Sequence, residues 1–134
     1  MVPNSIWNAS DHTETINTLS KLDDTFKFKI WCDDGCKDCR AQMPDFAAAL
    51  SAANIHSSCV EQYSVERLPT GKKKGPLVEE YGVTRIPTII IERESKQNPI
   101  RAPDEIARYV ELEDIPAADY LSGILANYLS KTRL

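Results

Sequence analysis

Two hydrophobic periods alternate along the chain and predict an α/β domain. Apolar and polar positions alternate over 26–32, and apolar or β-branched runs predict further strands over 60–65, 87–91 and 105–110. Apolar positions at helical spacing predict helices over 11–22, 36–53 and 75–82, and a last helix that begins at Pro116. This order of elements predicts a central mixed β-sheet flanked by helices on both faces.

Composition and charge fit one globular domain that spans residues 1–134, with an N-terminal helix over about 11–22. The chain has 134 residues, 42% of them hydrophobic and 27% charged, which is enough to build a core. No segment has the apolar length needed to cross a bilayer, and a net charge of −4 gives no general reason to bind nucleic acid or an anionic membrane. The N-terminus lacks the basic and apolar regions of a secretory signal, so we expect a cytoplasmic protein, and we expect a monomer.

Two cysteines carry the candidate chemistry. Cys36 and Cys39 are separated by two residues at the predicted junction of a strand and a helix, where they form a dithiol that can close into a disulfide. Pro44 follows Cys39 by five residues and lies inside the predicted helix, which it should kink. About fifty residues later, Pro87 enters an apolar strand, which suits a special X-Pro bond better than an ordinary central strand.

The order and spacing of these features resemble the thioredoxin family, over roughly Phe26 to Leu129. Members of that family carry C-x-x-C at the start of a helix, a proline five residues beyond the second cysteine, and an Ile-Pro-Thr segment after a Tyr-Gly-Val-like stretch. The resemblance implies a thioredoxin-like α/β fold and a thiol–disulfide oxidoreductase. It also implies that a redox-active Cys36–Cys39 disulfide serves in place of a bound cofactor.

The resemblance implies a role for each site residue. Cys36 is expected to be the nucleophile, with a pKa lowered by the helix N-terminus, and Cys39 the resolving thiol. The Ile86-Pro87 bond is expected to be cis beside the dithiol and to leave the backbone of Ile86 free to pair with substrate. Gly35 and Lys37 complete the expected substrate-binding residues, and no metal ligand is assigned.

Two departures from the family pattern affect the chemistry. Gly35 stands where the family usually has Trp, and Ile30 stands where many members have a buried Asp that accepts a proton from the resolving thiol. Water, Asp33 or Asp34 would have to accept the proton instead.

Cys32, four residues before Cys36, leaves several interpretations open. It is a candidate auxiliary thiol that forms a second disulfide with Cys36 on oxidation, or a buried strand-end thiol. Cys32, Cys36 and Cys39 together also match a three-thiolate metal or iron–sulfur pattern.

Another interpretation of the whole domain is a thioredoxin-fold binding module without redox turnover, because a fold does not imply a function. The remaining cysteine, Cys59, is expected to be a buried small hydrophobe.

The compartment gives the expected direction of the reaction. Cytosolic dithiols are kept reduced, so we expect this protein to reduce protein disulfides. Its expected partners are protein disulfide substrates and an upstream disulfide reductase, and neither nucleic acid nor a membrane is among them.

Overall fold

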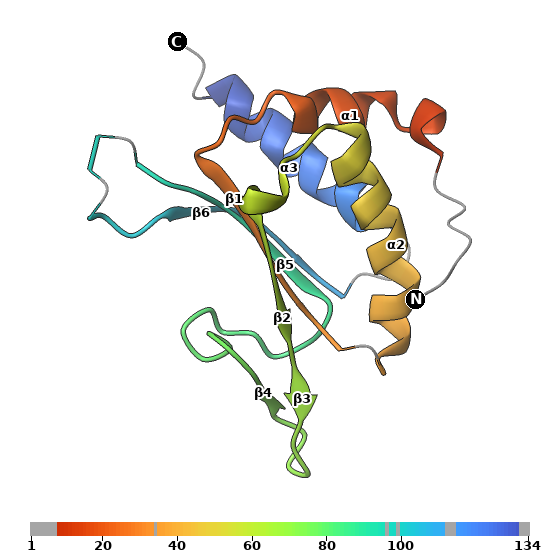
Figure 1. The fold of residues 1–134 in the computed structure, drawn as a ribbon, viewed down its shortest axis with the longest axis vertical. Helices are drawn as coiled ribbons and strands as arrows, with labels where there is room; N and C mark the ends of the chain where they lie inside the picture. The colour runs from red at the N-terminus through yellow and green to blue at the C-terminus, as the bar shows by residue number, and fades with distance from the viewer. Residues whose placement is uncertain (1–7, 34, 96, 99, 112–114, 132–134) are drawn as a thin grey trace.

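Four strands form one mixed sheet in the computed structural model, which describes residues 8–33, 35–95, 97–98, 100–111 and 115–131 (Figure 1). The strands are β1 (Phe26–Cys32), β2 (Val60–Ser64), β5 (Thr88–Arg93) and β6 (Asp104–Val110). Their order in the sheet is β2-β1-β5-β6. β1 runs parallel to β2 and antiparallel to β5, and β5 runs antiparallel to β6. β1 is therefore a central strand, and its C-terminal end delivers the chain to the cysteine loop.

Three helices pack on one face of this sheet: α1 (Thr13–Ser20), α2 (Lys37–Ala52) and α3 (Ala117–Lys131). Alternate residues of β1, among them Phe28 and Ile30, enter a buried cluster with Phe46 of α2 and Leu121 of α3. Figure 1 shows the three helices together on the same side of the sheet. The predicted helices over 11–22 and 36–53 are present with shorter bounds, and a 3-10 turn (Ala9–Asp11) precedes α1. The architecture differs from the expectation of helices on both faces.

The opposite face is covered by the segment 65–87, which contains no helix. It begins with a small hairpin of β3 (Glu66–Arg67) and β4 (Lys73–Lys74) and continues as a series of turns over 76–82. The predicted helix over 75–82 is therefore wrong. Leu77 adopts φ of 60° in the left-handed region, and such a residue interrupts a right-handed helix.

Trp31 holds this segment against the sheet. Its side chain is fully buried, and its indole N–H donates a 2.8 Å hydrogen bond to the carbonyl of Pro76. The rings of Tyr63 and Tyr81 pack beside the indole, each with its centroid 5.2 Å away. A second buried cluster, which includes Cys39, Val78 and Ile90, forms around Trp31 on this face. The cluster brings the turn segment and the cysteine helix into one packed unit.

A buried ion pair explains how the central strand β1 accommodates a lysine at position 29. Lys29, with a side chain 12% exposed, lies 3.1 Å from a Glu61 carboxylate oxygen and 3.8 Å from a Glu92 carboxylate oxygen. Tyr81 donates a 2.7 Å hydrogen bond to the other oxygen of Glu92. Burial of this Glu92 carboxylate is tolerated because it has two polar partners.

Among the described residues, no helix combines the length and apolar character needed to cross a membrane.

Candidate functional site

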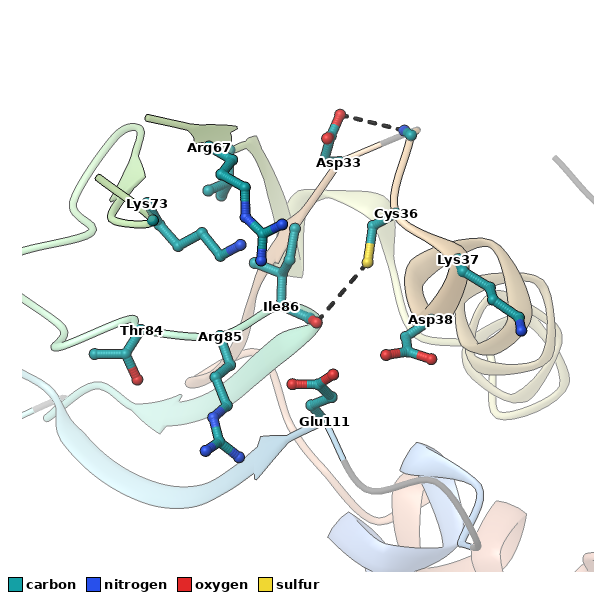
Figure 2. A pocket seen from close by; sticks show the side chains of 13 residues that line it. Asp33, Cys36, Lys37, Asp38, Arg67, Lys73, Thr84, Arg85, Ile86 and Glu111 are labelled. Atoms are coloured by element: carbon teal, nitrogen blue, oxygen red, sulfur yellow. Dashed lines mark hydrogen bonds between the residues drawn. The ribbon is translucent and has the colours of Figure 1, made fainter. Parts of the chain in front are cut away.

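Cys36 occupies the N-cap of α2, the helix that follows β1. Its backbone is extended, with φ of −81° and ψ of 124°, and its carbonyl accepts the 3.0 Å bond from Arg40 N–H that opens the helix. A tight turn precedes it, in which the Asp33 carbonyl accepts from Cys36 N–H at 2.9 Å. The Asp33 carboxylate accepts from Gly35 N–H at 3.3 Å (Figure 2). The turn leaves the Cys36 thiol half-buried at the helix N-terminus, where the peptide dipoles favour a negative charge.

Cys39 lies one helical turn further along α2 and is only 3% exposed. The two sulfurs of the C-x-x-C pair therefore differ in access. Cys36 is the more accessible sulfur, whereas Cys39 is enclosed by the second buried cluster. None of the four cysteines forms a disulfide in this structure, so the geometry is that of the dithiol.

The segment before β5 faces the Cys36 thiol. The Ile86-Pro87 peptide bond is cis, and the Cys36 thiol donates to the Ile86 carbonyl with a sulfur–oxygen distance of 3.9 Å. Thr88 donates from its hydroxyl to the Arg85 carbonyl at 2.6 Å, which closes the turn. The Ile86 backbone thus lies beside the dithiol although fifty residues separate the two in sequence.

Cys36 opens onto a cavity of about 510 Å³, a volume within the range of ligand sites. Three of the four expected substrate-binding residues, Gly35, Lys37 and Ile86, line it. The fourth, Pro87, is buried and does not line the cavity. Figure 2 shows Arg67 and Lys73 on the wall that faces Cys36 from the β3–β4 hairpin.

Cys32, at the end of β1, lies against Cys39. The Cys32 and Cys39 thiols shift each other's pKa through hydrogen bonding, and both cysteines line a second cavity of about 410 Å³ beside Met43 and Tyr63. This cavity is not lined by Cys36. The three cysteines therefore form a cluster in which both Cys32 and Cys36 influence the pKa of Cys39, while Cys36 and Cys32 line different cavities.

Hydrogen bonding and burial determine which of the three cysteines is most readily deprotonated to a thiolate. The Cys32 thiol is the largest cause that lowers the pKa of Cys39, to about 7, against the opposing effect of burial. The pKa of Cys32 is raised because it acts as donor to Cys39 and because it is partly buried. Burial raises the pKa of Cys36, and the backbone N–H of Cys39 only partly offsets that effect. The pKa of Cys36 is therefore raised and not lowered as expected, and the thiolate form is favoured at Cys39 instead.

Ile30 contributes nothing to proton transfer. It is 1% exposed and its side chain joins the cluster beneath the helices. Asp34, one of the alternative proton acceptors, lies outside the described residues. Asp33 acts mainly through its backbone, which donates to and thereby lowers the pKa of Cys39, whereas its charge raises that pKa.

A mixed four-stranded sheet with β1 and β5 at its centre, and three helices packed against it, decides the fold class. The fold is thioredoxin-like. No protein-family model and no curated protein matches the chain. Among solved structures, it is similar to the germline-specific thioredoxin protein Deadhead of Drosophila melanogaster, with 19% identity, a TM-score of 0.41, and coverage of 96% of this chain and 98% of that chain. A likeness this distant transfers no activity and no residue role.

The metal interpretation gains no support. Within the part of the chain that the structure describes, no group of three His, Cys, Asp or Glu side chains is arranged to hold a metal ion.

The fourth cysteine, Cys59, is 7% exposed and lines neither cysteine cavity. Its sulfur lies 4.0 Å from the Lys27 ammonium.

The cationic wall of the first cavity was not apparent from the sequence. Arg67 and Lys73 lie in a segment whose only signals are glycines and charged residues, without an apolar period that would reveal a hairpin. Their position relative to Cys36 depends on how the segment 65–87 folds across the sheet.

Proposed function

We propose that this protein is a thiol–disulfide oxidoreductase that reduces protein disulfides through Cys36 and Cys39. The observation that carries the proposal is the difference between the two sulfurs. Cys36 is reachable at a helix N-terminus beside the Ile86 backbone, and Cys39, one turn away, is enclosed and favoured as a thiolate. A buried structural cysteine needs neither the hydrogen-bonded thiolate nor the adjacent cavity.

The reaction proceeds by two thiol–disulfide exchanges. The Cys36 thiolate attacks one sulfur of the substrate disulfide, a Cys36–substrate disulfide forms, and the first substrate sulfur leaves as a thiolate that takes a proton from solvent. The Cys39 thiolate then attacks the Cys36 sulfur. The Cys36–Cys39 disulfide forms, and the second substrate sulfur leaves and is protonated in turn. A dithiol reductase or another thiol donor restores the two thiols.

Each step uses a different sulfur of the cluster. The first step needs Cys36 as a thiolate. The raised pKa of Cys36 lowers the amount of this thiolate, but Cys36 is the only one of the three cysteines that lines the larger of the two cysteine cavities, where a substrate can reach it. The second step needs a thiolate at Cys39, and the Cys32 thiol stabilises it. Cys32 thus favours the Cys39 thiolate by donating a hydrogen bond to it, whereas a carboxylate at position 30 would act by accepting the proton of that thiol. The proposal assigns the protein to a reducing compartment such as the cytoplasm, where the dithiol form persists.

The decisive experiment measures reduction of a protein disulfide by a small dithiol donor, with and without the protein. We expect acceleration by the parent, loss of acceleration in Cys36→Ser, and retention in Cys59→Ser, which removes a buried thiol outside the cluster. Cys39→Ser should accumulate the Cys36–substrate mixed disulfide, seen by mass spectrometry. A folded parent that performs no better than Cys36→Ser would support the binding-module alternative instead.

The direction of the reaction is tested by the reduction potential of the Cys36–Cys39 pair. A value near roughly −270 mV is typical of a reductase, and one near roughly −120 mV is typical of an oxidant. Equilibration with a dithiol buffer of known potential, followed by thiol labelling, gives this value. An oxidant's value would reverse the proposed direction while leaving the roles of the two cysteines unchanged.

A further inference from the structure

The β3–β4 hairpin places two cations over the Cys36 cavity. The hairpin directly follows β2, and Val65 N–H donates to the Cys32 carbonyl at 3.0 Å, which anchors this wall to the strand end that feeds the cysteine loop. Arg67 of β3 and Lys73 of β4 both line the cavity that contains Cys36. Figure 2 shows the cationic ends of both side chains pointing from the hairpin toward the space beside Cys36 and Ile86.

These two cations lie directly opposite each other in the hairpin. Arg67 and Lys73 are cross-strand partners, whereas the neighbouring pair, Glu66 and Lys74, has opposite charges. Like charges at directly opposed positions destabilise a strand pair. Neither Arg67 nor Lys73 forms an ion pair with any residue that the structure describes. The arrangement is unfavourable for the hairpin alone and becomes favourable when an anion occupies the cavity.

The acidic residues of the cavity do not neutralise this wall. The Asp33 carboxylate accepts from Gly35 N–H in the turn before Cys36. Asp38 and Glu111 lie together on another side of Cys36, away from the hairpin (Figure 2). The carboxylates of Asp38 and Glu111 share their part of the cavity with two further cations, Lys37 and Arg85, so the lining as a whole is rich in cations and the hairpin wall carries no carboxylate. An anionic group that enters beside Cys36 is attracted to the hairpin wall.

We propose that Arg67 and Lys73 select disulfides that carry a carboxylate close to the sulfur that Cys36 attacks. This inference rests on the proposed function and specifies its substrate class. The shared chemistry is a carboxylate adjacent to a disulfide, supplied either by an Asp or Glu beside a cysteine in a polypeptide or by a small anionic disulfide. The cations bind the carboxylate and hold the disulfide at Cys36, so their effect is on docking and orientation.

Matched peptide disulfides test this selection. Three short peptides that differ only in the residue after cysteine, Asp, Asn or Lys, are supplied as homodisulfides, and kcat/KM is measured for each. Dithiodipropionate and cystamine, small disulfides that end in carboxylates and in ammonium groups, form the second arm. We expect the parent to prefer the Asp peptide over the Lys peptide by roughly tenfold, a modest factor because ion pairs that remain in contact with solvent are weak. The preference should shrink as salt is raised.

Substitutions on the hairpin identify the residues responsible. Arg67→Gln combined with Lys73→Gln should abolish most of the preference for the Asp peptide over the Lys peptide, and a far-UV circular dichroism spectrum that matches the parent shows that the double variant has folded. Lys74→Gln is the matched control, because Lys74 lies on the same hairpin, opposite Glu66, and does not line the cavity. It should retain the preference.

The outcomes separate this inference from the proposed function. If the parent reduces none of the disulfides, the proposed function fails. If it reduces the Asn peptide but shows no preference for carboxylates in either arm, or if the double variant keeps the preference, this inference alone is overturned. A preference in the peptide arm only identifies a polypeptide substrate, and a preference in the small-disulfide arm only identifies a small anionic one.

Discussion

Cys32 offers the sharpest test of how this site works, because its thiol is assigned one measurable task. The pKa of Cys39 is lowered from 9.0 to about 7, and the hydrogen bond from Cys32 is the largest cause. A pKa difference of this size corresponds to a preference of roughly 3 kcal/mol for the thiolate. The Asp33 backbone and the Cys36 thiol also lower the pKa of Cys39, so removing Cys32 alone should raise that pKa only part of the way back toward 9.0 and reduce the thiolate fraction at neutral pH.

The matched variants are Cys32→Ala, which removes the donor, and Cys32→Ser, which keeps a hydroxyl donor. Thiolate absorbance is titrated against pH for Cys39 in a Cys36→Ser background. Relative to the midpoint of that background, we expect a clear rise with Cys32→Ala and a small change with Cys32→Ser. The value near 7 applies to the protein with all three cysteines, so the test compares the midpoints of the two Cys32 variants with the midpoint of the Cys36→Ser background.

The kinetic consequence has a defined sign. Thiolate is the nucleophile, so resolution of the mixed disulfide should speed up as pH rises through the pKa of Cys39 and level off above it. Cys32→Ala should shift this rise to higher pH and slow resolution at neutral pH by roughly tenfold at most, since a less acidic thiol is intrinsically more nucleophilic. Formation of the mixed disulfide by Cys36 should change less. An unchanged midpoint and an unchanged resolution rate in Cys32→Ala would refute the role assigned to Cys32.

Three further predictions concern access and packing. Iodoacetamide should label Cys36 before Cys39, because Cys39 is 3% exposed, and peptide mapping that found Cys39 labelled first would reverse the assignment. Gly75→Ala should lower the free energy of unfolding by roughly 1–3 kcal/mol in chemical denaturation, because its Cβ would lie 2.7 Å from a backbone carbonyl oxygen of β2. The exposed helical control Gly123→Ala has open space and should raise it by roughly 0.5–1 kcal/mol, so equal effects would contradict the packing of the segment 65–87. Glu92→Ala leaves a mostly buried lysine with one carboxylate partner fewer and should cost roughly 3 kcal/mol in the same denaturation assay, whereas a neutral result would mean that the ion pair does not stabilise the fold.

Local patterns determined the elements that carry their own periodicity. The alternation over 26–32 and the apolar stripe after Pro116 reappear as β1 and α3, because each buries one face and its sequence repeats with the period of the element. The position of Cys36 at a helix start followed from local signals, since Asp33 and Gly35 favour a turn and the alanine-rich segment after it favours a helix.

Other features of the site depend on contacts between distant segments, and no local pattern specifies them. The turns that replace the expected helix over 75–82 are held by the Trp31 bond to Pro76, and Leu77 departs from helical geometry within them. The contact of Cys32 with Cys39 could not be read from their spacing, which suggested Cys36 as the partner.

The sequence by itself determined which atoms are available for redox chemistry: a C-x-x-C dithiol at the start of a helix and a third thiol four residues upstream. Only the tertiary structure decided how the charge is distributed among them and what surrounds them. The pKa of a thiol depends on its burial and on the donors that touch it, and Cys39 obtains its main donor from the end of β1. The cations over Cys36 come from a hairpin about thirty residues away, which the sheet and Trp31 fold back across the site.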